Sequence, residues 1–434
     1  MSLGVDKTNV HPILSDAAIQ ALVTDYLADP IFNNRRVLVL IPDHTRTAPL
    51  PVLFRAVSDV LKTRVKVLNF MVALGTHQPL DETALLQLVG LTPYEKKTAY
   101  GSTGLLNHAW DNPHHLIQIG ELNPSQVEIL SEGLLHESVP LRLNRQILEH
   151  DVVLILGPVF PHEVAGFSGG NKYFFPGIAS AEFINSSHWL GALKTNYATN
   201  GIQHTPVRAM IDQAASFIAV DKRCLAFVSS PEGLHGMFYG SPESAWEEAV
   251  PMSAQIHMKL QDRPYMEVLG VAHTHYDDLW TAGKVMYKLE PVVATGGRLI
   301  IYAPQIDTIS YTHERWIRQV GYHVRDYFLS RMDRFSSVPR GVLAHSTHVR
   351  GTGTFENGVE KPRIRVILAT AIPENQCRAV KLGYRDPNDI DLATWQAQDP
   401  EKRLLVNPAG ETLYRVNNPR NKNGKDVSHA NRNS

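Results

Sequence analysis

The chain has 434 residues, of which 43% are hydrophobic, enough to bury a large core in two or three domains. Its 42 basic and 43 acidic residues leave a formal net charge of -1, so composition gives no indication of a nucleic-acid or anionic-membrane partner. No apolar run approaches the roughly 18 residues of a membrane span, and the first residues lack the basic and apolar regions of a signal peptide. We therefore expect a cytoplasmic protein that acts on a small molecule.

The first half of the chain alternates between two apolar patterns. Continuous apolar runs predict strands at 37–41, 65–74 and 151–159, and one-sided apolar patterns predict helices around 53–61 and at 81–89. This alternation is typical of an α/β domain with a largely parallel sheet, which we place at residues 1–255. In such sheets, ligands bind beyond the carboxyl ends of the strands, so the loops after Ile41, Leu74 and Phe160 are expected to form one site.

The second half repeats the pattern after a polar, irregular stretch at 252–264. Strand-like segments are predicted at 266–272, 297–302 and 364–370. We expect a second α/β domain with a largely parallel sheet at 270–400, and an active site in the cleft between the two domains. Residues 401–434 are expected to form a return segment and then a mobile polar tail, because the chain from about Asn417 lacks apolar periodicity.

The densest chemical signal is a glycine-rich loop from Phe160 to Lys172. Its segment Gly166-Phe167-Ser168-Gly169-Gly170 would let backbone amides approach an anion such as a phosphate. The P-loop pattern fails, because Lys172 follows Asn171 and precedes Tyr173 where that motif needs Gly-Lys-Ser/Thr. A tight turn into a helix near Ala179 is the structural alternative.

Two further loops carry polar residues directly after predicted strands. In Asp43-His44-Thr45-Arg46, the guanidinium of Arg46 suits a carboxylate or phosphate, and Asp43 could orient it or hold a ligand hydroxyl. A local ion pair is the alternative for this loop. His77 ends another strand, where its imidazole could act as a general base or be a structural group.

Cysteine usage limits the metal chemistry that the chain can support. Cys224 and Cys377 are the only two cysteines, which excludes a disulfide framework, a four-cysteine zinc site and an iron-sulfur cluster held by several thiolates of this chain. A transition metal would therefore be bound by imidazole, by carboxylate, or by a ligand that the protein does not encode.

Taken together, these loops resemble those of the lactate racemase family. The resemblance covers the segment 165–172 with Pro176-Gly177, the loop 43–46, His77, His162, His188 and Lys284 within 281–284. It implies that Lys172 covalently holds a nickel-pincer nucleotide, the pyridinium-3-thioamide-5-thiocarboxylic acid mononucleotide with nickel, and that His188 is the protein ligand of the metal. It also implies cofactor-maturation enzymes as partners.

The resemblance further implies a racemase or 2-epimerase of a 2-hydroxy acid. The nucleotide would accept hydride reversibly from carbon 2, through a 2-keto acid intermediate, while His77 and His162 serve as the acid/base pair for the two enantiomers. Arg46 and Lys284 would bind the carboxylate and polarise the oxygen. The remaining cofactor-binding residues would be Asp43, Thr45, Ser168, Gly169 and Gly170.

Several positions depart from the lactate racemase pattern. They are Thr47 for a proline, Gln78 and Asn171 for arginines, Glu163-Val164 for aromatic residues and Thr281 for a glutamine. The smaller Thr281 could admit a substrate side chain longer than methyl. His345, His348 and Arg350, before the turn 351–353, could bind the far end of a dicarboxylic or sugar acid, or could form a solvated loop.

Two other functions compete with this interpretation. A zinc hydrolase or lyase could use the paired histidines His273, His275, His345 and His348, which can supply three ligands and leave an open position. A non-catalytic protein with the same fold could instead bind a nucleotide or phosphosugar. Neither alternative uses Lys172, His188, His77 and His162 together.

Overall fold

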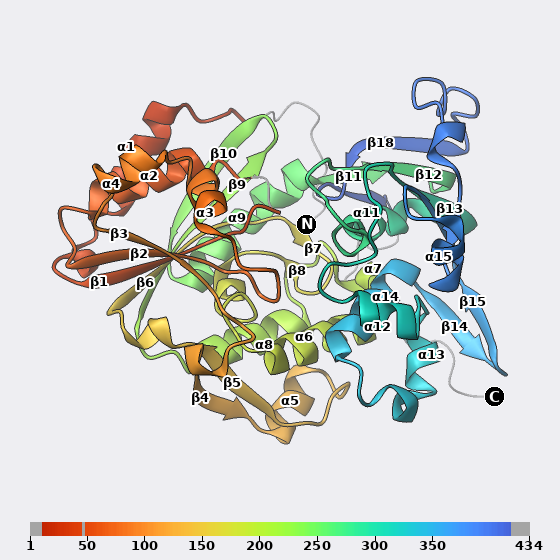
Figure 1. Ribbon diagram of the computed structural model, residues 1–434, viewed down its shortest axis with the longest axis horizontal. Coiled ribbons are helices and arrows are strands. Elements are labelled where there is room, and N and C mark those ends of the chain that lie inside the picture. The colour runs from red at the N-terminus through yellow and green to blue at the C-terminus, as the bar shows by residue number, and fades with distance from the viewer. Residues whose placement is uncertain (1–10, 46–47, 418–434) are drawn as a thin grey trace.

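The computed structural model describes residues 11–45 and 48–417 and contains two sheets of mainly parallel strands, one in each half of the chain (Figure 1). The first sheet has the order β10-β9-β6-β1-β2-β3. Its strands are β1 (Arg36–Ile41), β2 (Val67–Val72), β3 (Thr103–Asn107), β6 (Val152–Pro158), β9 (Asp221–Ser230) and β10 (Gly233–Gly240). All neighbours pair in parallel except the β9–β10 hairpin.

The apolar run of β1 is buried because helices cover both faces of this sheet. Alternate residues of β1 join two different cores, since side chains along a strand point to opposite faces. Val37, Val39 and Ile41 pack with α1 (Asp16–Tyr26), α2 (Leu50–Leu61) and α3 (Glu82–Val89). Leu38 and Leu40 belong to the core that includes α6 (Ala181–Lys194), α8 (Pro206–Ala215) and α9 (Pro242–His257).

The second sheet has the order β17-β16-β13-β12-β18, and all of its strand pairs are parallel. Its strands are β12 (Tyr265–Ala272), β13 (Val293–Ala303), β16 (Arg365–Thr370), β17 (Gly383–Tyr384) and β18 (Arg403–Ala409). The prediction of two α/β domains with largely parallel sheets is therefore confirmed. Because β18 lies beyond residue 400, the second sheet extends further along the chain than the range 270–400 expected from the sequence.

The expectation of an irregular stretch at 252–264 was wrong. Helix α9 continues to His257, and β11 (Met258–Gln261) then pairs in parallel with β19 (Leu413–Val416). The polar composition suggested an irregular segment because α9 buries only one face and exposes the other. The buried face includes Trp246, Ala249 and His257. Of the predicted tail, residues 418–434 lie outside the described residues.

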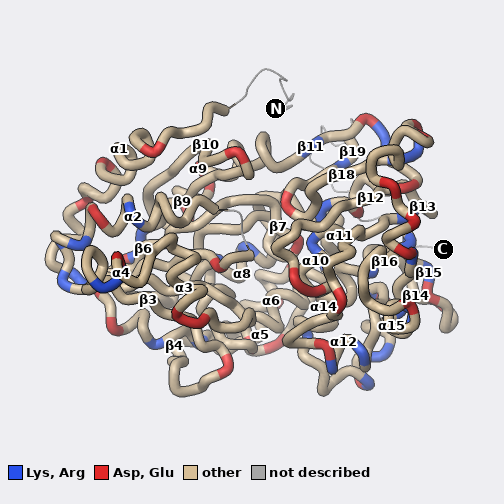
Figure 2. Tube along the Cα trace, turned by 45° about the horizontal axis from the view of Figure 1, so that its top comes forward, with Lys and Arg blue, Asp and Glu red and all other residues tan. Residues whose placement is uncertain are grey.

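The surface carries charges of both signs. Lys and Arg are interspersed with Asp and Glu over both halves of the chain (Figure 2). Among the described residues, the longest and most apolar helices fall short of what a membrane crossing requires.

Candidate active site

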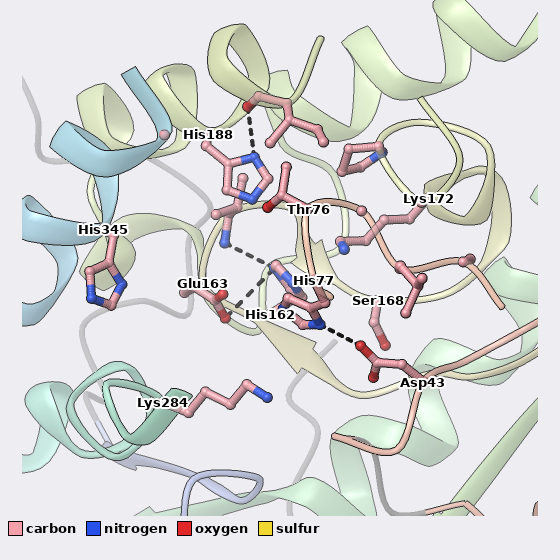
Figure 3. A pocket seen from close by; sticks show the side chains of 18 of the residues that line it. Asp43, Thr76, His77, His162, Glu163, Ser168, Lys172, His188, Lys284 and His345 are labelled. Atoms are coloured by element: carbon pink, nitrogen blue, oxygen red, sulfur yellow. Dashed lines mark hydrogen bonds and ion pairs between the residues drawn. The ribbon is translucent and has the colours of Figure 1, made fainter. Parts of the chain in front are cut away.

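A cavity of about 210 Å³ lies where the loops after β1, β2 and β6 face the second domain (Figure 3). From the first domain, the predicted residues that line it are Asp43, His77, His162, Ser168, Gly169, Lys172 and His188. From the second domain, they are Thr281, Lys284, His345 and His348. Arg46 lies outside the described residues, and its role stays a prediction. The three loops therefore meet at one edge of the sheet, as the topology predicts.

Asp43 orients His77. The buried carboxylate of Asp43 accepts a hydrogen bond from Nδ1 of His77, and its other oxygen accepts bonds from the backbone amide of Thr45 at 3.1 Å and the Thr45 hydroxyl at 2.7 Å. Because Nδ1 carries the proton, Nε2 of neutral His77 is left as an acceptor. Thr45 does not line the cavity. The structure thus favours a positioning role for Asp43 and Thr45 over the predicted cofactor contacts.

His162 is held in the opposite tautomer. It lies on the short strand β7 (Pro161–His162) and is 3% exposed. Its Nδ1 accepts hydrogen bonds from the backbone amides of Val164 at 3.1 Å and Ala165 at 3.4 Å. Neutral His162 must then carry its proton on Nε2. The two histidines therefore differ at rest, since His77 keeps an acceptor at Nε2 and His162 keeps a donor there.

The anion cradle predicted at Ser168-Gly169-Gly170 stays a prediction, and the amides of Ser168 and Gly170 already face protein atoms. The Ser168 amide donates to the carbonyl of Phe160 at 2.8 Å, its hydroxyl donates to the carbonyl of Pro158 at 2.9 Å, and the Gly170 amide faces the Cys224 thiol. The glycines also have a structural reason, because φ is +85° at Gly169 and +57° at Gly170. A Cβ at Gly170 would also lie only 3.0 Å from the carbonyl oxygen of Pro242.

Two buried residues hold this loop through hydrogen bonds to its carbonyls. Neither was predicted from the sequence. Arg208 on α8 donates to the carbonyls of Phe167 at 2.6 Å and Gly169 at 3.2 Å, and its guanidinium lies 4.2 Å from the ring centre of Trp246. Trp246 on α9 donates from Nε1 to the carbonyl of Ser168 at 2.8 Å. The available signal was an arginine on the apolar face of a helix, between Val207 and Met210.

The loop leads into the short 3₁₀ helix 170–173, which carries Lys172, and α6 brings His188 to the same cavity. Nδ1 of His188 donates to the carbonyl of Ile184 at 2.8 Å, which leaves Nε2 as the acceptor. Desolvation and, to a smaller extent, the positive charge of Lys172 lower the pKa of His188 to about 4. His188 is therefore neutral at pH 7.

The second domain closes the cavity with the short helices α10 (Leu279–Ala282) and α11 (Lys284–Leu289). Asp278 caps α10 by accepting a bond from the Thr281 amide at 2.8 Å. Lys284 begins α11, and its Nζ lies 5.1 Å from the ring centre of Tyr276. Figure 3 shows its side chain extending toward the cavity from the side opposite His188. An ammonium group thus faces the loops of the first domain.

The predicted polar cluster around His345 is helical, so a solvated loop is excluded. His345 and His348 lie one turn apart on the buried face of α14 (Arg340–Arg350). The Tyr287 hydroxyl lies 2.7 Å from Nδ1 of His345, and Trp280 stacks on the ring with centroids 3.8 Å apart. His345 therefore forms part of the wall of the cavity.

Arg350 was wrongly predicted to bind substrate. It lines neither this cavity nor the neighbouring one. Its guanidinium donates to the carbonyl of Lys381 at 2.7 Å and lies 3.6 Å from Glu360. As the last residue of α14, Arg350 points away from the face that carries His348.

The zinc alternative finds no support in the described part of the chain. His273 and His275 stack on each other with ring centroids 4.4 Å apart, and neither lines the cavity. Across residues 11–45 and 48–417, no three His, Cys, Asp or Glu side chains form a group that could hold a metal ion. The histidine pairs thus do not assemble the predicted ligand set.

Comparison with known sequences identifies a matching family model and two relatives. Residues 7–201 match the family model of the lactate racemase N-terminal domain. A lactate racemase from Thermoanaerobacterium thermosaccharolyticum is 26% identical over 230 residues, covering 52% of this chain and 48% of that protein. A lactate racemase from Lactiplantibacillus plantarum is 24% identical over 247 residues, covering 56% and 51%. The chain spans about half the length of these two relatives.

Solved structures resemble nearly the whole chain. A crystal structure of a protein from Thermotoga maritima has a TM-score of 0.86 and 32% identity, and the match covers 93% of this chain and 99% of that one. The lactate racemase apoprotein from Thermoanaerobacterium thermosaccharolyticum has a TM-score of 0.67 at 19% identity over 92% of this chain and 93% of that one, which shows a shared fold. Residues 7–201 are thus similar to the lactate racemase N-terminal domain, and nearly the whole chain shares the fold of a lactate racemase apoprotein.

Proposed function

We propose that this protein is an isomerase that racemises or epimerises a 2-hydroxy acid at carbon 2, with a nickel-pincer nucleotide attached to Lys172. The observation that carries the proposal is the convergence of Lys172, His188, His77 and His162 on one cavity, with Lys284 facing them from the other domain. The match of residues 7–201 to the lactate racemase N-terminal domain, and two relatives that are named lactate racemases, support this reaction class.

The residues around Lys172 fit such a cofactor. His188 is neutral, and its Nδ1 is fixed on a backbone carbonyl, which is how proteins orient a histidine whose other nitrogen binds a metal. Both cysteines are fully buried and do not line the cavity, so soft sulfur ligands would come from the nucleotide. When bound, the nucleotide would supply the acceptor for the hydride that leaves carbon 2 of the substrate.

The two histidines supply the proton chemistry. Loss of hydride from carbon 2 is easier when the hydroxyl loses its proton at the same time, so a base must face that hydroxyl. His77 presents Nε2 as the acceptor, because Asp43 holds the proton on Nδ1. His162 presents a donor at Nε2, because two backbone amides occupy Nδ1. One histidine thus accepts the hydroxyl proton of one enantiomer, while the other is poised to return a proton to the oxygen for its mirror image.

Lys284 would bind the carboxylate of the substrate. Its ammonium group extends from α11 toward the loops of the first domain, where an anionic substrate would meet it (Figure 3). Arg46, if it adds a bidentate contact as predicted, would fix the carboxylate plane as well as its charge. The domain interface would then orient the substrate between the two histidines.

The first test is the intact mass and nickel content of protein from its native host, or from a strain that carries the family's cofactor-maturation enzymes. We expect an added nucleotide mass with nickel in the wild type and none in Lys172→Ala. Lys194→Ala is the matched control, since Lys194 pairs with Glu132 at 2.8 Å and does not line the cavity. His188→Ala is expected to keep the nucleotide and lose nickel. Unmodified, nickel-free wild-type protein from a competent host would reject the proposal.

A further inference from the structure

We propose that the substrate is a polyhydroxylated 2-hydroxy acid, such as an aldonic acid, whose hydroxyl groups beyond carbon 2 are bound by Glu163 and His348. This inference rests on the proposed function and names the substrate class of the same site. Both residues line the cavity, and neither has a role in the hydride or proton steps described above.

His348 is a buried polar side chain whose unsatisfied ring nitrogens indicate a bound ligand. Its side chain is 4% exposed, and neither Nδ1 nor Nε2 has a hydrogen-bond partner in the described structure. Burying an imidazole with both nitrogens unsatisfied is costly unless a ligand or water supplies the bonds. His345, one turn away, uses Nδ1 on a tyrosine hydroxyl, so the lack of partners is specific to His348.

Glu163 brings a carboxylate into the same cavity. It lies between β7 and β8 (Gly166–Phe167), is 17% exposed, and has an oxygen 3.7 Å from Nδ1 of His162. Glu163 and His348 line the same cavity, and the charge of Glu163 acts to raise the pKa of His348, which burial lowers. In Figure 3, Glu163 lies on the cavity side of His162, toward His345 and Lys284.

This pair of groups matches alcohols better than it matches a second carboxylate or an apolar chain. Burial lowers the pKa of His348 to about 4, so the neutral ring offers one N–H donor and one acceptor, as a hydroxyl does. A carboxylate at Glu163 accepts hydrogen bonds from hydroxyls and repels another carboxylate. An apolar chain would leave both ring nitrogens of His348 unsatisfied.

The cationic side chains that line the cavity have other proposed partners. Lys172 is the proposed attachment point, and Lys284 is the proposed partner of the first carboxylate. Arg350, which could have paired with a second carboxylate, is turned toward Glu360 and the Lys381 carbonyl. A dicarboxylic acid would therefore bring its far carboxylate to Glu163 without a matching cation among the described lining residues.

The surroundings of His348 stay polar beyond the first cavity. His348 also lines a second cavity of about 170 Å³, together with Asn196, Glu290, Arg325 and Thr347. The Thr347 hydroxyl is buried there without a hydrogen-bond partner among the described residues. Polar atoms thus continue past His348, and the guanidinium of Arg325 is already engaged with Asp326 and the Leu193 carbonyl, so this region favours hydroxyl groups over a second carboxylate.

The test compares four acids on the nickel-loaded holoenzyme: gluconate, 2-hydroxyhexanoate of equal carbon number, malate and lactate. We expect kcat/KM for gluconate to exceed that for 2-hydroxyhexanoate and for malate by about tenfold or more, a difference of one well-made polar contact. Glu163→Gln and His348→Phe should each reduce the gluconate-to-hydroxyhexanoate ratio about tenfold, mainly through KM. Arg350→Gln is the control, and it should keep the wild-type ratio.

Binding gives a second readout that does not need turnover. In saturation-transfer NMR of the holoenzyme, the protons on carbons 3 to 6 of gluconate should receive transfer in the wild type and lose most of it in His348→Phe. A preference for malate or 2-hydroxyhexanoate, or an unchanged ratio in both variants, would overturn the inference and leave the proposed function intact. Nickel-loaded, nucleotide-bearing protein that isomerises none of the four acids would instead overturn the proposed function, and this inference with it.

Discussion

The carboxylate of Asp43 accepts the Nδ1 proton of His77, and this contact links the ends of two adjacent parallel strands. Asp43 follows β1 and His77 follows β2, so the register of the sheet brings the two side chains together. The bond fixes both the tautomer and the ring orientation of His77. It thereby leaves Nε2 of this half-exposed, cavity-lining histidine as an acceptor, as the proposed base role requires.

Replacing Asp43 with asparagine should reduce kcat about 10- to 100-fold, because an amide can donate to Nδ1 and stabilise the wrong tautomer of His77. The rate is measured by chiral chromatography on nickel-loaded protein of unchanged cofactor mass. For a substrate with an equilibrium constant of one, kcat/KM must fall equally in both directions. Thr45→Ser, which keeps the hydroxyl beside Asp43, should retain most of the activity. Full activity in Asp43→Asn would remove the carboxylate from the mechanism.

His77→Ala and His162→Ala should each abolish isomerisation while the nucleotide stays attached. Each enantiomer requires proton transfer at its oxygen, and the two histidines present opposite tautomers to the cavity. Chiral product analysis and intact mass on the same samples separate loss of chemistry from loss of cofactor. Substantial turnover in either variant would exclude that histidine as an acid/base residue.

Arg208→Met should lower the free energy of unfolding by about 3 kcal/mol, because it removes two charged hydrogen bonds to loop carbonyls and leaves them buried. Trp246→Phe removes one neutral bond to the Ser168 carbonyl and should cost only about 1 kcal/mol. Urea unfolding measures both values. Intact mass then reports whether the Lys172 loop still receives the nucleotide, and we expect less modification in Arg208→Met. Equal stability of the two variants would show that the guanidinium does not fix the loop.

The fold was largely predictable because its strands are continuous apolar runs. The segments 37–41 and 151–159 leave no polar face, which only a sheet covered on both sides tolerates, and both became central strands. The stretch 252–264 was wrongly predicted for the opposite reason, because its helix and strand are partly polar. A one-sided surface helix and an exposed edge strand share their polar composition with a loop, and only the long-range pairing of β11 with β19 distinguishes them.

The site was predictable as a set of loops but not as a set of contacts. Sheet topology brings the ends of β1, β2 and β6 together, so Asp43, His77 and Lys172 could be assigned to one cavity. The partner of each polar atom depends on side-chain geometry that no local pattern records. For that reason Asp43 was assigned to the cofactor although it binds His77, and the amides of the glycine loop were assigned to phosphate although most bind protein atoms.

Gly170→Ala separates the two explanations of the glycine loop. Both Gly170 and Gly75 have positive φ, at +57° and +58°, so an alanine at either position should cost about 1 kcal/mol in backbone strain. At Gly75 the added Cβ meets nothing within 4 Å, whereas at Gly170 it lies 3.0 Å from the Pro242 carbonyl oxygen and from the Trp246 side chain. We therefore expect Gly170→Ala to unfold at clearly lower urea concentration than Gly75→Ala. Equal stability, with loss of the nucleotide in Gly170→Ala alone, would support the anion cradle.

The stability of the protein should fall as pH falls from about 6.5 toward 4, and His108 gives a clean probe of this effect. Burial lowers its pKa from the ordinary 6.5 to about 4, and its ring is held neutral while Nε2 donates to the Ala179 carbonyl and Asn144 donates to Nδ1. In this pH window the unfolded chain binds a proton at His108, and the folded chain does not. Stability is therefore complete above pH 6.5 and is lost at about 1.4 kcal/mol per pH unit for this one group as pH falls.

The measurement is urea unfolding of the wild type and His108→Gln at several values between pH 4.5 and 7.5. The variant should be less stable at neutral pH, because it disturbs a buried hydrogen-bond pair, yet its stability should depend less steeply on pH by about one proton. His136→Gln, at a position with a 67% exposed side chain, should keep the wild-type slope. Parallel pH profiles for the wild type and His108→Gln would mean that His108 is protonated as readily in the folded chain as in the unfolded one, and that its burial does not limit acid stability.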